Sequence, residues 1–165
     1  TLTGIVVAAR IGSAFAAELG TMKVNEELNA LETMGLNPVR FLVAQRVLAG
    51  ILLTPLLTVY AIVVSIAGGV LIMMTMGFSL ETIYRQMALS LTCTDILIGV
   101  GKGLIFGAIV AGIGCLRGLQ TKQGPSAVGD STTRAVVTSI VLVIIVDALV
   151  AVLLYYLGVG VELGI

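Results

Sequence analysis

Three ionisable side chains lie inside long apolar stretches of this chain, where a charge is costly. They are Arg10, Lys102 and Asp147. Charged groups in such surroundings are usually paired or functional. Lys102 and Asp147 carry opposite charges, so they either join two helices as an ion pair or form a polar patch in a transport cavity. For Arg10 we favour a structural role, in which its long side chain reaches the aqueous boundary or caps backbone carbonyls.

Residues for covalent or metal chemistry are scarce. The chain has no His, and its two cysteines, Cys93 and Cys115, are not in a CxxC arrangement. The usual zinc ligands and histidine bases are therefore missing. The polar stretch at 124–134 contains Ser, Thr and Asp but no base to pair with them. We expect no catalytic residue, no metal site and no cofactor in this chain.

The composition indicates a membrane protein. Of the 165 residues, 58% are hydrophobic and 11% are charged, whereas soluble domains average about 45–50% and about 25%. Nine basic and nine acidic residues give a net charge of zero, so no basic surface for nucleic acid is predicted. The length fits a single domain over residues 1–165.

Four apolar segments are long enough to cross a membrane as helices, which takes roughly 20 residues. The sequence predicts an all-α fold with spans at residues 1–19, 47–74, 96–116 and 135–157. Lys and Arg gather in the first and third connections, which places both in the cytoplasm and the C-terminus on the opposite side. A rise of about 1.5 Å per residue places Lys102 and Asp147 at similar depth, roughly 21 and 18 Å from the cytoplasmic ends of their spans.

The first connection predicts an amphipathic helix at residues 21–34. Val24, Leu28 and Leu31 share one face of it. Helices that lie among lipid headgroups are usually rich in Lys and Arg, whereas this segment is mainly acidic. A cytoplasmic protein is therefore the better partner for it.

Two further segments organise the helices. Residues 80–91 predict a second amphipathic helix, which covers the outer end of the bundle. In the third span, a spacing of four places small residues on one face, where another helix can approach closely. We favour packing within the chain over a dimer seam for this face, which consists of Gly99, Gly103, Gly107, Ala111 and Cys115.

Helix ends are marked by capping residues. Gly35 fits the position after the last turn of the first amphipathic helix. Asn37 fits the N-cap of the next helix, with Pro38 in its first turn, and Ser79 fits the N-cap of the second amphipathic helix. The last span is expected to begin with an N-cap at Asp130 or Ser131.

Two stretches of the chain resemble the MlaE (YrbE) family of ABC-transporter permeases. They are GSAFAAELGTMKVNEELNALETMGLNPVRFLVAQR at Gly12–Arg46 and GPSAVGDSTTRAVV at Gly124–Val137, the latter followed by Asp147. The resemblance covers essentially the whole chain, with two departures. Family members usually have an N-terminal interfacial helix, one more span and an Arg-Glu-Leu-Gly stretch before the point where this sequence starts. Gln45 stands where a proline is common in the family.

The resemblance implies a homodimeric, multi-pass permease of the bacterial inner membrane with a periplasmic C-terminus. It also implies a cytoplasmic ABC ATPase that binds ATP and Mg²⁺, a periplasmic MCE-domain protein and often a STAS-domain protein. The implied cargo is phospholipid, moved between the inner and outer membranes to maintain outer-membrane lipid asymmetry. Arg10, Lys102 and Asp147 become candidates for the lipid cavity. The implied coupling helix contains Glu26, Glu27, Leu28, Leu31, Glu32 and Met34.

A second class of function stays open from the intramembrane charges alone. An ion-coupled secondary carrier or proton-channel subunit would use Asp147 and Lys102 as a relay. Such a protein predicts no ATPase partner and a transport rate that follows a proton gradient. A purely structural membrane scaffold explains the small residues of the third span but not the amphipathic helix of the first connection.

Overall fold

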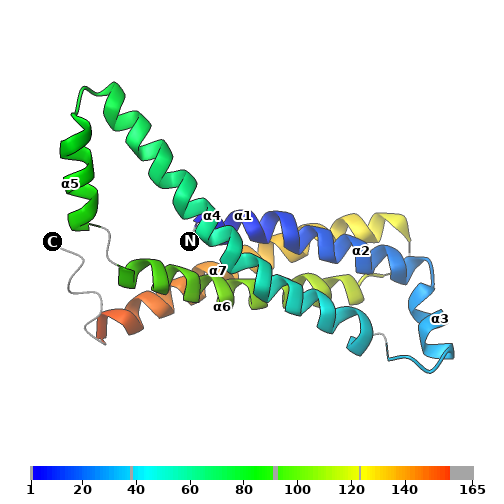
Figure 1. Cartoon of the computed structure of the whole chain (residues 1–165). Coiled ribbons are helices and arrows are strands. Elements are labelled where there is room, and N and C mark those ends of the chain that lie inside the picture. The colour runs from blue at the N-terminus through cyan, green and yellow to red at the C-terminus, as the bar shows by residue number, and fades with distance from the viewer. Residues whose placement is uncertain (1, 38, 91–92, 123, 157–165) are drawn as a thin grey trace.

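The computed structural model describes residues 2–37, 39–90, 93–122 and 124–156, and the secondary structure in these ranges is helical. Four helical units are long and apolar enough to cross a membrane: Leu2–Val24, Val39–Thr75, Thr94–Leu119 and Ser126–Tyr156. The all-α fold with four spans is therefore confirmed (Figure 1). The predicted limits at residues 1, 91 and 157 lie outside the described ranges, as does Pro38.

The first span is built from three helical pieces. α1 (Leu2–Val7) is followed by a π-helical turn, η1 (Ala8–Gly12), and then by α2 (Ser13–Val24). The hydroxyl of Ser13 lies 2.6 Å from the carbonyl oxygen of Ala9 and 3.0 Å from that of Arg10. It therefore satisfies carbonyl groups at the wide turn, and Arg10 lies inside that turn.

The first connection contains a shorter helix than the sequence suggests. α2 runs on to Val24, and Glu26 then adopts a left-handed conformation with a φ of 59°. This backbone conformation stops the helix of the span, because it breaks the regular hydrogen-bonding pattern. The second helix, expected from Thr21, consequently begins after Glu26 as α3 (Glu27–Thr33).

The glycine predicted to end α3 is confirmed in that role. Gly35 has a φ of 75°, and its N–H donates to the carbonyl of Glu32 at 3.0 Å. The N–H of Leu36 donates to the carbonyl of Leu31 at 3.1 Å. These two bonds form a Schellman motif, which satisfies the last carbonyls of a helix and favours glycine at the left-handed position.

The N-caps predicted at Asn37 and Ser79 are also confirmed. Asn37 precedes η2 (Val39–Val43), which continues into α4 (Ala44–Thr75), and its Oδ1 accepts a bond of 3.1 Å from the N–H of Val39. Ser79 precedes α5 (Leu80–Ser90), and its hydroxyl accepts a bond of 3.4 Å from the N–H of Thr82.

The N-cap predicted at Asp130 or Ser131 is wrong. α6 (Cys93–Leu119) is followed by α7, which already begins at Pro125 and extends to Tyr156. Proline fits the first turn of a helix because its fixed φ is helical and its missing N–H needs no partner there. Asp130 and Ser131 thus lie in the second turn, and Asp130 pairs with Arg134 at 2.9 Å.

α6 packs closely against α4 on one side and against α2 on the other. A Cβ atom added to Gly107 would lie 2.5 Å from the carbonyl oxygen of Gly50 in α4. On its other side, a Cβ added to Gly118 would lie 2.7 Å from the Cβ of Leu19 in α2. Each of these contacts leaves no room for a side chain, so small residues set the distances between the helices.

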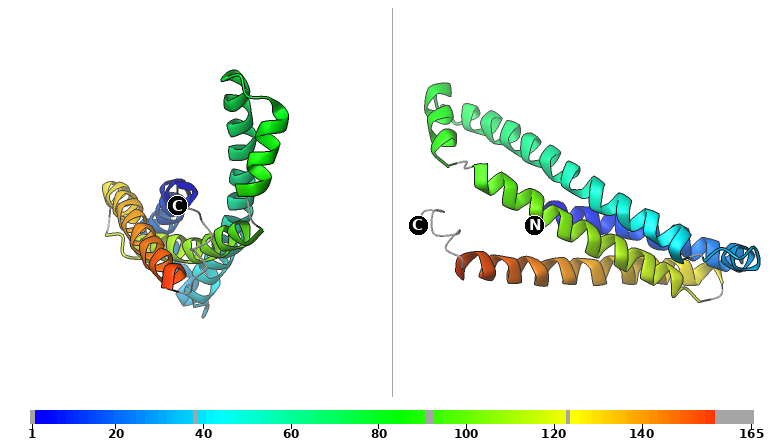
Figure 2. Two further views of the ribbon diagram at one scale, coloured as in Figure 1. Left: turned by 90° about the vertical axis from the view of Figure 1, so that its left-hand side faces the viewer. Right: turned by 60° about the horizontal axis from the view of Figure 1, so that its bottom comes forward.

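The remaining core lies between the first span, α6 and α7. It contains the buried residues Val7, Ala8, Phe106, Val110 and Val143. The later half of α4 and the helix α5 stand away from the other helices (Figure 2). α3 and the connection between α6 and α7 lie at the opposite end of the bundle from α5 (Figure 1). Both connections that are rich in basic residues therefore lie at the same end.

The close approach of α6 to α4 can be tested with two glycine substitutions on α6. Gly107→Ala places a methyl group against a backbone oxygen, and overpacking of this kind costs about 1–3 kcal/mol. We expect a lower thermal unfolding midpoint for the full-length protein in detergent. Gly112→Ala is the matched control, because a Cβ there meets nothing within 4 Å. It should leave the midpoint unchanged or raise it slightly, and equal midpoints for the two variants would contradict the packing.

Candidate functional site

Lys102 and Asp147 form an ion pair between α6 and α7. The Nζ atom of Lys102 lies 3.0 Å from Oδ1 of Asp147, and the two side chains are 22% and 20% exposed. A partly buried pair at this distance is charge-assisted and well placed to hold two spans in register. The remaining exposure also leaves the pair accessible to a polar group from outside the chain, so the geometry fits both interpretations of these residues.

Arg10 lies in a different place, beside an apolar hollow. The hollow has a volume of about 280 Å³ and lies between the first span and α4. Val6, Leu57 and Tyr60 contribute to its walls, and Arg10 is exposed at the same hollow. An alkyl chain fits apolar walls of this kind, while the guanidinium supplies a partner for an anionic group.

α3 turns part of its predicted apolar face toward the chain itself. Leu28 is only 8% exposed and Leu31 is half-buried. The exposed surface of the helix is mainly acidic, with Glu26, Glu27 and Glu32, and ends at Met34, which is 66% exposed.

Three exposed apolar residues follow α3, and the sequence analysis did not single them out. They are Leu36, Val39 and Phe41. A signal for them is present in the sequence, because apolar side chains follow the predicted amphipathic helix within the first connection. We call the set of Met34, Leu36, Val39 and Phe41 the apolar tip.

A second ion pair links the two spans that flank α3. Nη2 of Arg46 in α4 lies 2.9 Å from Oε2 of Glu18 in α2. The two residues are separated by the whole first connection, so spacing along the sequence gave no sign of the pair. It fixes both ends of the connection that carries α3.

The family model described as Permease MlaE matches residues 1–153. The chain belongs to the MlaE permease family. Its relatives include a probable ABC transporter permease protein of Synechocystis, 43% identical over 145 residues, which are 87% of this chain and 55% of the relative. The chloroplast protein TRIGALACTOSYLDIACYLGLYCEROL 1 of Arabidopsis thaliana is 42% identical over 147 residues, which are 88% of this chain and 42% of the relative.

A third relative is a probable ABC transporter permease protein of Rickettsia typhi. It is 36% identical over 155 residues, which are 93% of this chain and 60% of the relative. The chain thus spans about half the length of the curated MlaE relatives it matches. Membership of the MlaE family favours a permease over the ion-coupled carrier and over the structural scaffold.

The contribution of the Lys102–Asp147 pair can be measured by removing one charge and then both. Asp147→Asn takes the carboxylate away from the Lys102 ammonium, and a charge at the centre of a span costs on the order of 3 kcal/mol. We expect reduced stability of the full-length protein, measured by its unfolding midpoint in detergent. Adding Lys102→Met should restore most of the loss, because the charge itself is then removed. A double variant that is less stable than Asp147→Asn alone would show that the pair does not act as a unit.

Proposed function

We propose that this chain is part of the membrane subunit of an ATP-driven transporter that moves phospholipid between the inner and outer membranes of a bacterium. The observation that carries the proposal is the match to the MlaE permease family over residues 1–153. Two relatives are named probable ABC transporter permeases. The Arabidopsis relative carries the name of a galactosylated diacylglycerol, which is a lipid.

The hollow beside Arg10 supports a lipid cargo. Its walls are mainly apolar, and its volume is about 280 Å³. An acyl chain can occupy apolar walls of this kind at little cost in free energy. The phosphate of the same lipid would meet the Arg10 guanidinium. The wide turn of η1 also supports a functional site here, since π-helical turns occur frequently at functional sites.

The proposed mechanism uses α3 as the coupling helix. Binding of ATP and Mg²⁺ closes two ATPase subunits, which displace α3 in each of two permease copies. The displacement reaches the first span and α4, which α3 connects and which the Glu18–Arg46 pair joins. Accessibility of the lipid site then changes, and the lipid passes to or from a periplasmic MCE-domain protein. A STAS-domain protein completes the proposed complex.

This proposal changes the roles of the predicted coupling residues. Because Leu28 is buried in its own chain, its substitution would first affect folding. The acidic surface of α3 and the apolar tip are the parts left to face an ATPase. A groove with apolar walls and a basic rim on the ATPase would complement both.

Transport in proteoliposomes tests the function directly. The full-length protein is reconstituted with its ATPase, and movement of a fluorescent phospholipid is followed with ATP, with a proton gradient, or with neither. We expect movement only with ATP. Movement that follows the proton gradient without ATP would overturn the proposal in favour of an ion-coupled carrier.

The apolar tip gives a sharper test of coupling. Phe41→Glu introduces a charge on a side chain that is 47% exposed, so the fold should tolerate it while a buried contact with the ATPase should not. A charge forced into an apolar interface typically costs a few kcal/mol, which is a loss of about tenfold or more in affinity. Co-purification of the ATPase and ATP-driven lipid movement should both fall.

The matched control for Phe41→Glu is Tyr84→Glu. Tyr84 is 76% exposed on α5 at the opposite end of the bundle, so its substitution should leave ATPase binding unchanged. Full ATPase binding and transport by Phe41→Glu would exclude the apolar tip from the contact.

A further inference from the structure

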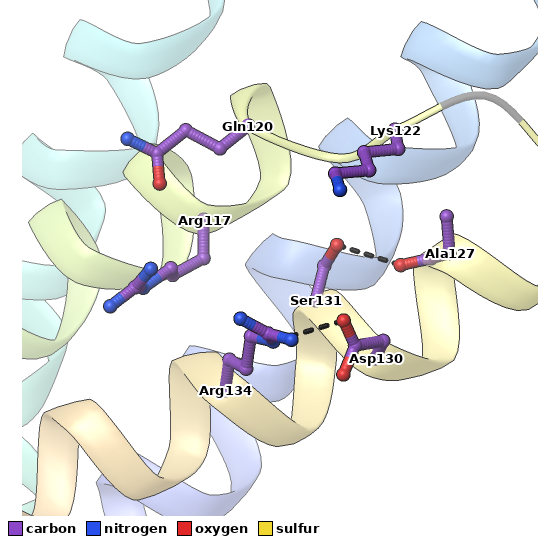
Figure 3. A pocket seen from close by; sticks show the side chains of 7 residues that line it. All are labelled: Arg117, Gln120, Lys122, Ala127, Asp130, Ser131 and Arg134. Atoms are coloured by element: carbon purple, nitrogen blue, oxygen red, sulfur yellow. Dashed lines mark hydrogen bonds and ion pairs between the residues drawn. The ribbon is translucent and has the colours of Figure 1, made fainter.

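Three basic side chains gather where α6 ends and α7 begins. Arg117 lies in the last turn of α6, Lys122 in the connection and Arg134 in α7. They line a common hollow of about 180 Å³. In Figure 3, Lys122 and Arg134 approach this hollow from opposite sides, one from the connection and the other from the helix.

One hydrogen bond joins the connection to α7 at the wall of the hollow, and a second lies within α7. The hydroxyl of Thr121 donates to that of Ser131 at 2.8 Å, and the hydroxyl of Ser131 donates to the carbonyl of Ala127 at 2.7 Å. Thr121 and Ser131 are 2% and 8% exposed. Buried hydroxyl groups with these bonds fix the connection against α7, so the basic groups above them are carried on an ordered surface.

The charge around the hollow is strongly unbalanced. Three cations face a single carboxylate among its lining residues, that of Asp130, whose Oδ2 lies 2.9 Å from Nε of Arg134. Arg117 uses Nη2 to donate to the hydroxyl of Thr138 at 3.3 Å. Its Nε is buried and has no hydrogen-bond partner among the residues that the structure describes. A buried guanidinium donor without an acceptor in the protein is usually satisfied by a water molecule or a bound ion.

We propose that this hollow binds a phosphate group. A phosphate carries several acceptor oxygens and a negative charge, which match guanidinium and ammonium donors converging from different directions. The hollow has room for several groups of the size of a water molecule, each of about 30 Å³. A phosphate group with its four oxygens therefore fits inside it. A carboxylate would use fewer of the available donors.

The position of the hollow indicates which kind of molecule carries the phosphate. α6 and α7 are both spans, and the hollow lies where α6 leaves its apolar segment at Leu119. This is the level of lipid headgroups, and basic pockets between spans on the cytoplasmic side bind anionic headgroups. The site is distinct from the hollow beside Arg10 and does not depend on the proposed transport, so the ligand we assign is a resident anionic phospholipid of the adjoining leaflet.

Native mass spectrometry of the full-length protein, stripped of lipid and titrated with phosphatidylglycerol, tests the assignment. Lys122→Gln and Arg134→Gln each remove a charge from an exposed position, so folding should be preserved. We expect each variant to bind one phosphatidylglycerol per chain on the order of tenfold more weakly than wild type. Asp130→Asn should bind it more tightly, because it removes the competing carboxylate and releases Arg134.

The opposite signs expected for Lys122→Gln and Asp130→Asn separate a binding site from a structural role, which would weaken binding in both. Arg40→Gln is the matched control, because it removes an exposed positive charge at the same end of the bundle without touching the hollow. It should bind phosphatidylglycerol as wild type does.

A parallel titration with inorganic phosphate distinguishes the two sources. Binding of inorganic phosphate that displaces the lipid and depends on Lys122 would keep the phosphate site and identify its ligand as soluble. If Lys122→Gln and Arg134→Gln weaken the binding of neither phosphatidylglycerol nor inorganic phosphate, the proposal is overturned. The hollow would then be free to bind another ligand, such as an acidic protein segment. If the wild-type protein binds phosphatidylglycerol at this site but shows no ATP-driven phospholipid movement, the result would count against the proposed transport function and not against the site.

Discussion

The close approach of α6 to its two neighbours determines how the other helices are placed. In a membrane, lipid chains are as apolar as the side chains, so helices associate through close packing and hydrogen bonds. Gly103 and Gly107 bring α6 against α4, whereas Gly114 and Gly118 bring it against the first span. α6 therefore has helices packed on two sides, and its one lysine within the span pairs with α7, where Asp147 lies 3.0 Å away.

The sequence predicts the elements better than their contacts. Length and apolarity define the four spans, and local chemistry defines the ends at Gly35 and Asn37, because each depends on a few neighbouring residues. The row of small residues from Gly99 to Ala111 indicated a close helix but could not name α4 as its partner. The second small face, with Gly114 and Gly118, was missed. The start of α7 lies before the predicted N-cap at Asp130 or Ser131, because Pro125 already fits the first turn of a helix.

The candidate site residues also differ in how far the sequence predicts their contacts. Similar depths of Lys102 and Asp147 could be derived from the constant rise of a helix, which made their meeting predictable. The hollow beside Arg10 depends on how α4 crosses the first span and on a wide turn with no compositional signal. The inward direction of Leu28 depends on α3 folding back on its own chain, which helical periodicity alone does not reveal. Periodicity identifies a face but not what lies opposite it.

Glu26 has a mechanical consequence for the first connection. Among the described residues it is the only non-glycine with a positive φ, a conformation that stores strain. Two residues, Asn25 and Glu26, therefore separate two regular helices, so a force applied to α3 would act on the first span about a defined break and not through a continuous helix. At its other end α3 leads into α4, and the Glu18–Arg46 pair ties that helix to the first span. A load applied to α3 would thus reach both spans.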